Sequence, residues 1–168
     1  FRFSHTAGTL RPQPRKSNGF NGPVDTALSR DGILHVLSRA GSKKQALVKR
    51  ITKLTIAGEF IAVCDFGATV SGDDMMQWPA SIALDSQGLM YVSDEALQRV
   101  SVLDAEGVFL RNWGVKGRGD GEFNRPSGLA FDRDENLLVV DGLNDRVQKY
   151  TKDGEFLGQW GERGAGDG

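Results

Sequence analysis

The sequence predicts an all-β protein, a β-propeller of four-stranded antiparallel blades, and three observations lead to this fold class. First, residues 79–121 align with residues 126–168 without a gap and match at 16 of 43 positions, which reveals an internal repeat of 47 residues. Second, each copy contains four short stretches with the apolar patterns of β-strands. Third, many of the 22 glycines recur at fixed offsets, where they mark turns between strands.

Each of the two clear copies has the same order of strands. A proline opens an alternating first strand, and the second strand is more continuously apolar, as expected where a sheet is covered on both faces. A turn with Gly107 or Gly154 separates the third strand from the fourth. The expected strands are 79–85, 90–93, 100–103 and 109–113 in one copy, and 126–132, 137–140, 147–150 and 156–160 in the other. Four short strands in one such repeat are typical of a propeller blade.

An earlier, more divergent copy precedes these two. Its expected strands are 24–28, 33–37, a third that opens at Arg50, and 60–66. The spacing from Pro23 to Pro79 is 56 residues, nine more than the repeat, and most of the excess lies between the second and third strands. We therefore expect one partial propeller over residues 1–168, divided into an N-terminal strand and linker (1–18) and three blades (19–74, 75–121 and 122–168).

Three blades alone would leave an unpaired sheet face, whereas closed propellers typically have four to eight blades. We therefore expect the rest of the propeller to lie C-terminal to Gly168. Residues 1–5 are then expected to form an outer strand that joins the final blade. No segment combines an apolar period of 3.6 residues with helix caps, so no helix is predicted.

The composition argues against several classes of function. The net charge is −1, with 21 basic and 22 acidic residues, so no overall field favours nucleic acid or an anionic membrane. No apolar run approaches the ~18 residues of a membrane span, and no signal peptide is visible. Cys64 is the only cysteine, which excludes an intrachain disulfide and a cysteine-based zinc site. We expect a soluble protein without a cofactor, in a compartment and oligomeric state that the sequence leaves open.

The third copy carries a set of short motifs at fixed spacing: Pro126–Ala130, Val140-Asp141, Asn144–Val147, Gly154–Leu157 and Trp160-Gly161. These motifs resemble the NHL repeat, and the resemblance extends over residues 19–168. The second copy departs from the pattern at Leu97-Gln98 and at Ser81, and the first copy has Ser38 where the pattern has aspartate. The resemblance implies a six-bladed propeller used mainly as an interaction platform. Such proteins include ubiquitin-ligase segments that bind RNA or protein, sensor domains of bacterial kinases, and an amidating lyase, and the fold alone does not choose among them.

Features that recur at the repeat spacing are expected to build the blades. An aspartate and an arginine flank the loop between the second and third strands, and we expect each pair to clamp that loop. The expected structural clamps are Asp94 with Arg99 and Asp141 with Arg146. Trp113 and Trp160 are likewise expected to pack between neighbouring blades, and the glycine-rich segment 114–121 to connect two blades.

Features that do not recur are the candidates for binding. They are the basic loop 39–50, with Lys43, Lys44 and Lys49, together with Trp78, Arg125 and Asp25. The loop, Trp78 and Arg125 are expected on the loop-rich face, where propellers commonly bind because loops vary on a rigid scaffold. Asp25 is expected where a first strand enters the central channel, and it is the one plausible metal ligand among those positions.

These residues favour a protein- or peptide-binding scaffold, with no catalytic residue, metal site or cofactor predicted in this segment. One alternative is a metal-dependent lyase or hydrolase with its site in the central channel. The sequence argues against it because His5 and His35 are the only histidines, whereas a catalytic zinc usually has three protein ligands. A second alternative is RNA binding through the basic loop 39–50, which would require exposed aromatic side chains near the charge.

Overall fold

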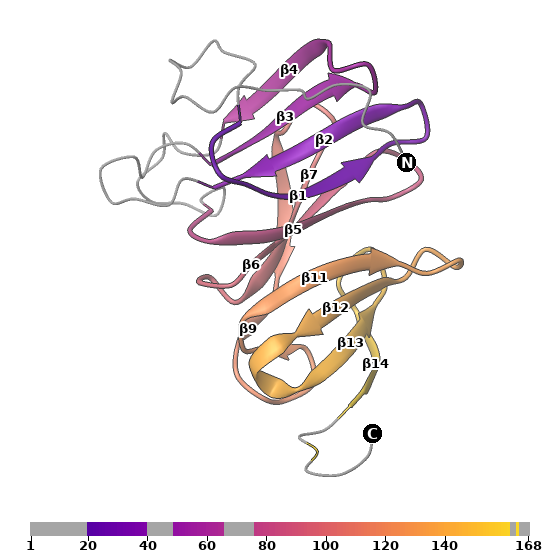
Figure 1. Cartoon of the computed structure of the whole chain (residues 1–168). Coiled ribbons are helices and arrows are strands. Elements are labelled where there is room, and N and C mark those ends of the chain that lie inside the picture. Colours follow the sequence, from indigo (N-terminus) through magenta and orange to yellow (C-terminus); the bar gives the residue numbers. More distant parts are fainter. Residues whose placement is uncertain (1–19, 40–48, 66–75, 162–163, 165–168) are drawn as a thin grey trace.

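Three four-stranded antiparallel sheets make up the computed structural model, which describes residues 20–39, 49–65, 76–161 and 164 (Figure 1). In each sheet the strands are neighbours in chain order. Blade 1 contains β1 (Pro23–Leu28), β2 (Ile33–Ser38), β3 (Arg50–Thr55) and β4 (Phe60–Asp65). Blade 2 contains β5 (Pro79–Leu84), β6 (Met90–Asp94), β7 (Arg99–Leu103) and β8 (Phe109–Trp113). Blade 3 contains β11 (Pro126–Phe131), β12 (Leu137–Asp141), β13 (Arg146–Tyr150) and β14 (Phe156–Trp160).

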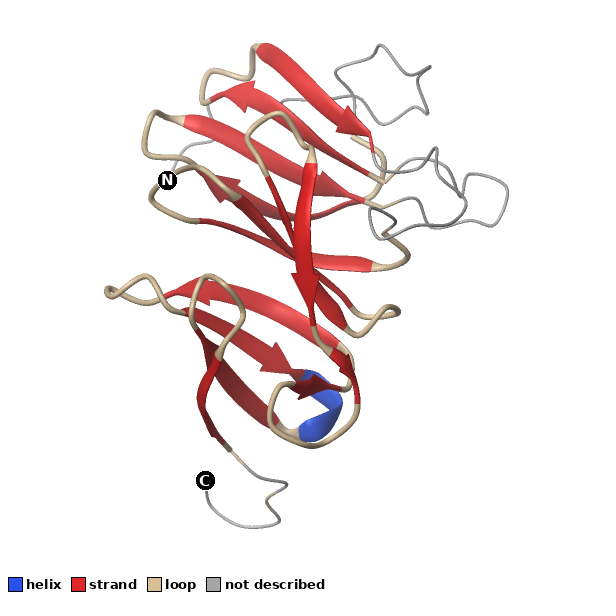
Figure 2. Ribbon diagram, turned by 180° about the vertical axis from the view of Figure 1, so that it is seen from behind, coloured by secondary structure: helices blue, strands red, loops and turns tan. Residues whose placement is uncertain are grey.

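The all-β fold class and the order of strands predicted from the repeat are confirmed. Each strand begins and ends within one or two residues of its expected position. The expected N-terminal strand lies outside the described residues. In the described part of the chain, the helical content is one 3-10 turn at Gly142–Asn144 (Figure 2), and no helix there is long and apolar enough to cross a membrane.

One feature that the sequence did not predict is a small parallel pair in the connection between blades 2 and 3. It joins β9 (Val115–Lys116) to β10 (Glu122–Phe123). The Glu122 carboxylate folds back over the loop and accepts the amides of Arg118 at 2.9 Å and Gly119 at 2.8 Å. Gly117 makes this approach possible, because a Cβ there would lie 1.9 Å from Glu122 Oε2. The loop is therefore an ordered part of the blade junction.

The first strands of the three blades lie side by side at the centre of the fan (Figure 1). The register of each ladder shifts just after its proline, between Pro23 and Asp25 in β1, Pro79 and Ser81 in β5, and Pro126 and Leu129 in β11. Such a shift takes a residue out of the ladder and re-aims its backbone groups. Two backbone amides of these inner strands, those of Ile82 and Leu129, are donated to side chains of the preceding blade, as described for the site below.

The hydrophobic core lies between the sheets, in two layers. One layer joins blades 1 and 2 through Leu37, Ile51, Cys64, Met76, Ile82, Met90, Val92 and Leu103. The other joins blades 2 and 3 through Ala83, Tyr91, Val100, Val102, Phe123, Leu137, Val139 and Tyr150. All five residues of β6 are buried, because that strand faces both layers, which explains its continuous apolar pattern.

In blades 1 and 2, a side chain on the fourth strand packs over a glycine turn of the next blade. Cys64 and Trp113 occupy equivalent register positions, opposite Ile51 and Val100. A Cβ at Gly107 would lie 2.6 Å from Cys64 Cβ, and one at Gly154 would lie 2.6 Å from Trp113 Cδ2.

Trp113 therefore packs between blades, as expected. Trp160 has the same register position on β14, opposite Val147. It is 56% exposed, and its expected packing between blades is not seen among the described residues, where β14 belongs to the last sheet.

The sheets present two faces that differ in their connections. The loops between second and third strands, with the connections that lead into the first strands, form the upper face. The turns between first and second strands and between third and fourth strands form the lower face. In Figure 1 the β12–β13 loop lies on the left, at the upper face, and the β11–β12 turn lies on the right, at the lower face.

Candidate binding site on the upper face

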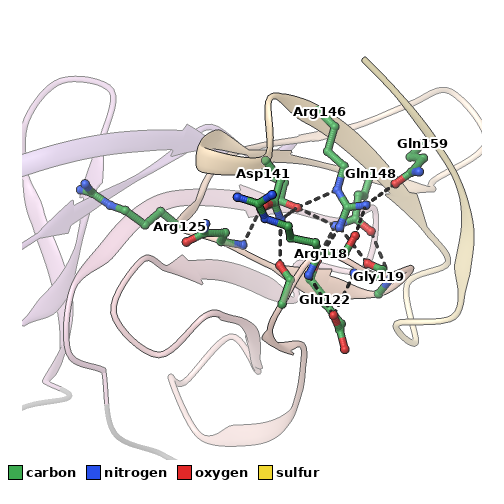
Figure 3. A network of polar contacts seen from close by, with 12 residues as sticks. Arg118, Gly119, Glu122, Arg125, Asp141, Arg146, Gln148 and Gln159 are labelled. Carbon is green, nitrogen blue, oxygen red and sulfur yellow. Dashed lines mark hydrogen bonds and ion pairs between the residues drawn. The ribbon is translucent and has the colours of Figure 1, made fainter. Parts of the chain in front are cut away.

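Asp141 and Arg146 form a buried ion pair at the upper end of blade 3 (Figure 3). The two residues are opposite each other in the β12–β13 ladder, and Arg146 Nε lies 2.8 Å from Asp141 Oδ2. The side chain of Arg146 is 7% exposed, and that of Asp141 is 0% exposed. The other Arg146 donors bind the carbonyl oxygens of Arg118 at 3.0 Å, Gly119 at 2.8 Å and Glu122 at 2.9 Å. The pair therefore fastens blade 3 to the connection that precedes it.

Asp94 holds the corresponding loop of blade 2 through backbone amides. Its carboxylate accepts the amides of Gln77 at 2.6 Å and Trp78 at 3.0 Å on one side, and those of Ala96 at 2.9 Å and Leu97 at 3.0 Å on the other. Arg99 lies opposite Asp94 in the β6–β7 register. The bonds to Asp94 fix the backbone of Trp78 at the edge of the upper face.

Asp25 connects the inner strands of blades 1 and 2. Its Oδ2 accepts Ser81 Oγ–H at 2.6 Å and the Ile82 amide at 2.9 Å. Ser81 Oγ in turn accepts the Leu129 amide at 3.2 Å, which continues the series into blade 3. Both amides belong to first strands, which are the inner edges of their sheets.

The carboxylate that the sequence offered as a channel ligand is thus engaged in bonds between blades. In the described part of the chain, no three His, Cys, Asp or Glu side chains gather as metal ligands would. His35 is 5% exposed, and burial lowers the pKa of its imidazole.

The residue before each opening proline lies at a junction between blades, and its identity does not recur. Gly22, Trp78 and Arg125 occupy this position. Their carbonyl oxygens accept equivalent amides, from Arg39 at 2.9 Å, Glu95 at 3.0 Å and Gly142 at 3.3 Å. The same backbone hydrogen bond therefore forms at each junction, whereas the side chain at this position differs from blade to blade.

Trp78 carries an arginine from the neighbouring blade on its ring. The guanidinium carbon of Arg39 lies 4.5 Å from the ring centroid, and Arg39 Nη1 donates to the carbonyl oxygen of Pro79 at 3.1 Å. Such a stack is attractive because the ring face is electron-rich. The Trp78 side chain remains 39% exposed, so part of the indole is open to solvent beside a cation.

Arg125 forms the matching contact at the next junction. Its guanidinium binds Glu95, with Nε 3.0 Å from Oε2, and its amide donates to Gln98 Oε1 at 2.7 Å. The Arg125 side chain is 54% exposed, whereas that of Glu95 is 16% exposed. Arg125 has a φ of 60°, a left-handed conformation that is uncommon for a residue with a side chain.

Arg39, Trp78, Glu95, Gln98 and Arg125 together form a strip across three blades, which we call the upper-face strip. The sequence predicted Trp78, Arg125 and the loop 94–99 on this face, but Glu95 and Gln98 within that loop were not among the predicted binding residues. Lys49 lies next to β3 and is partly exposed, whereas Lys43 and Lys44 lie outside the described residues. The strip offers an aromatic face, two guanidinium groups and a carboxylate, which suit stacking and hydrogen bonding.

The fold is similar to solved propeller structures at low sequence identity. A streptogramin B lyase structure superposes with a TM-score of 0.60 and 17% identity, over 86% of this chain and 42% of that one. A gluconolactonase from Xanthomonas campestris gives 0.50 and 21%, over 74% and 36%. A chain of a nidogen/laminin complex gives 0.56 and 19%, over 83% and 50%.

The chain spans 42% of the streptogramin B lyase chain and of the virginiamycin B lyase from Staphylococcus aureus, under half of either. No curated protein matches the sequence. A family model described as "DUF5128: 6-bladed beta-propeller" matches residues 77–161, which are half of the chain. The chain therefore belongs to this DUF5128 family of six-bladed β-propellers.

Proposed function

We propose that the protein is an NHL-type propeller that binds a protein or peptide partner through the upper-face strip. The observation that carries this proposal is the exposed indole of Trp78, with Arg39 stacked on it, at a blade junction where the side chain does not recur. Tryptophan and arginine contribute most often to the binding energy of protein interfaces. The recurring polar residues Asp94 and Asp141 are, by contrast, fully buried in bonds within the propeller.

The NHL assignment is supported by what the motif residues of blade 3 do. Asn144 Nδ2 donates to Asp141 Oδ2 at 2.8 Å, beside the bond from Arg146. The three polar residues of the motif thus act together to close one loop. A Cβ at Gly128 would lie 3.2 Å from a methyl carbon of Val140, so a residue without a side chain suits this point of β11.

The side chains of the strip indicate the chemistry of the partner. Arg39 presents a guanidinium group on the exposed indole, and Arg125 presents one at the next blade junction, where it binds Glu95. Guanidinium groups recognise carboxylates through paired hydrogen bonds. A peptide with an apolar or aromatic side chain next to an acidic residue would match this arrangement.

Selection of peptides tests the proposal. Peptides would be selected from a random displayed library on the wild-type protein, and their Kd measured by fluorescence anisotropy. Trp78→Ala should weaken the selected peptides by about 30-fold, since truncation of such an anchor typically costs about 2 kcal/mol. Ile56→Ala, at a 70% exposed apolar residue on the lower face, is the matched control and should change nothing. Peptides that bind Trp78→Ala as tightly as wild type would contradict the proposal.

The same assay separates RNA binding from peptide binding. A single-stranded oligouridylate would be titrated at about 50 mM and 200 mM salt. RNA binding predicts a steep loss of affinity with salt, because counterions are released from the phosphates. Binding of this kind, together with failure to select a peptide, would replace the proposed partner with RNA.

A propeller enzyme is the second candidate, because the fold is shared with structures named as streptogramin B lyase and gluconolactonase. Asp25 would be the channel residue of this chain that such a site used. Elemental analysis of the purified protein tests this candidate. A stoichiometric metal that is lost in Asp25→Asn would favour the enzyme over the scaffold.

A further inference from the structure

A cavity of about 330 Å³ opens on the lower face, at the ends of the three inner strands. Its lining comes from equivalent positions of all three blades, where β1, β5 and β11 turn into the next strand. The lining residues are Leu28, Ser29, Arg30, Leu84, Asp85, Ser86, Phe131, Asp132, Arg133 and Glu135. This volume is at the lower end of the range for small-molecule sites, about 300–1,000 Å³. The cavity lies at the opposite ends of the sheets from the upper-face strip.

An apolar residue from each blade contributes to the wall. Leu28, Leu84 and Phe131 are the last residues of β1, β5 and β11. Leu84 and Phe131 also pack against the two core layers. Leu28 is 56% exposed, so apolar surface is open to solvent inside the cavity. A leucine exposed in a polar-rimmed hollow suits an apolar ligand group.

Two of the carboxylates around the cavity are engaged by lysines. Asp132 pairs with Lys149 at 2.7 Å, and Glu135 pairs with Lys152 at 3.1 Å. Glu135 also accepts the Ser86 amide at 3.1 Å, which joins the rims of blades 2 and 3. These contacts lower the pKa of both carboxyl groups, so both are ionised at neutral pH and matched by cations.

The third carboxylate, Asp85, is directed into its own turn. It is 7% exposed and accepts the amides of Gln87 and Leu89, each at 2.9 Å, with the Tyr91 hydroxyl 3.4 Å away. Hydrogen bonds from the amides of its own turn thus stabilise the charge of the Asp85 carboxylate. Ser29 is engaged in the equivalent turn of blade 1 through Ile33.

The rim arginines are the groups left for a ligand. The Arg30 side chain is 80% exposed, and its one ion pair in the described part of the chain is a 3.7 Å contact with Glu135. Arg133 is exposed and forms no ion pair with the described residues. The lining residues carry two positive charges, on Arg30 and Arg133, and three negative charges, on Asp85, Asp132 and Glu135. Lysines or turn amides engage the three carboxylates, so the two arginines are the charged groups that remain available to a ligand.

We propose that this cavity binds a small amphipathic anion, with an apolar body against Leu28, Leu84 and Phe131 and a carboxylate between Arg30 and Arg133. A free aliphatic acid and the C-terminus of a peptide share this chemistry. The site is independent of the partner proposed for the upper face, because the two use different residues on opposite faces.

Titration with matched probes tests the site. Octanoate, octyltrimethylammonium, N-acetyl-Leu-Leu and the amide of that dipeptide would each be added to the ¹⁵N-labelled protein and followed by amide chemical shifts. Octanoate or the dipeptide acid should saturate shifts at Leu28, Ser86 and Glu135, and the better of the two identifies the source of the anion. The ammonium probe and the dipeptide amide should bind more weakly by about ten-fold, because they lack the charge that the arginines recognise.

Variants decide whether the named residues form the site. Arg133→Gln and Arg30→Gln should each weaken the better anion about three- to ten-fold, and Leu28→Ser should do the same through the apolar wall. Arg118→Gln, on the upper face, is the matched control and should leave the Kd unchanged. Three results would overturn the proposal: no saturable binding of either anion, equal binding of the ammonium probe, or affinities unaffected by both cavity arginine variants.

Discussion

Replacement of Arg146 by methionine is expected to destabilise the propeller strongly. The substitution removes five donated hydrogen bonds, to Asp141, Gln159 and the carbonyl oxygens of residues 118, 119 and 122. It also leaves the Asp141 carboxylate, which is 0% exposed, without its cation. Loss of one partner of a buried ion pair typically costs about 3–5 kcal/mol. Asp141 keeps bonds from Asn124, Asn144 and Gln148, so we expect the lower part of that range, about 3–4 kcal/mol.

Urea denaturation followed by tryptophan fluorescence measures the effect. With a slope of about 2 kcal/mol/M, the midpoint should fall by about 1.5–2 M urea. Arg146→Lys keeps the charge and loses the planar fork, so its midpoint should fall between those of Arg146→Met and wild type. Arg118→Met is the control, because that side chain is exposed, and it should change the free energy of unfolding by less than about 0.5 kcal/mol. An Arg146→Met protein within about 1 kcal/mol of wild type would refute the clamp.

Two further predictions concern the interface between blades 2 and 3. Gly154→Ala should cost about 3 kcal/mol in urea unfolding, because its Cβ would lie 2.6 Å from Trp113 at a φ of 90°, whereas Gly88→Ala, with a φ of 84° and open space, should cost about 1 kcal/mol. Equal costs would argue against the packing described. Burial, with Asp85 nearby, raises the pKa of Tyr91 to about 12, and burial also raises that of Tyr150. Absorbance at 295 nm should therefore show no tyrosinate in the folded protein up to about pH 11. The neutral tyrosines contribute stability below the unfolded pKa of about 10, and that contribution is lost as pH rises through the folded values. Ionisation of a tyrosine near pH 10 in the folded state would contradict this burial.

The blades were predictable because the residues that form them recur along the sequence at a fixed spacing. A repeat of 47 residues places Pro79 and Pro126 at equivalent points, and the apolar pattern between them determines which residues face the next sheet. The β9–β10 pair was not predictable in this way. Its two strands have two residues each, and their pairing depends on the approach of Glu122 to Gly117, which no local pattern signals.

The location of the upper-face strip could be predicted from the sequence, whereas the contacts between its side chains could not. Failure to recur singled out Trp78 and Arg125, because side chains at a repeated backbone position vary only where the fold does not need them. The stack of Arg39 on Trp78 joins residues 39 positions apart in two blades, so it depends on how the blades are placed. Asp25 was interpreted as a channel carboxylate, and its bonds to Ser81 and Ile82 depend on how β1 and β5 of two blades lie side by side.

A comparison of two tryptophans tests the central claim, that recurring residues build the blades and non-recurring residues on the upper face bind. Unfolding free energy and the Kd of a selected peptide would be measured for Trp78→Ala and Trp113→Ala. We predict that Trp78→Ala weakens binding of the peptide about 30-fold and changes the free energy of unfolding by less than about 1 kcal/mol. Trp113→Ala should lose about 3 kcal/mol of stability, with the Kd of the folded protein unchanged. An unchanged Kd in Trp78→Ala, or a weakened peptide in a stable Trp113→Ala protein, would contradict the claim.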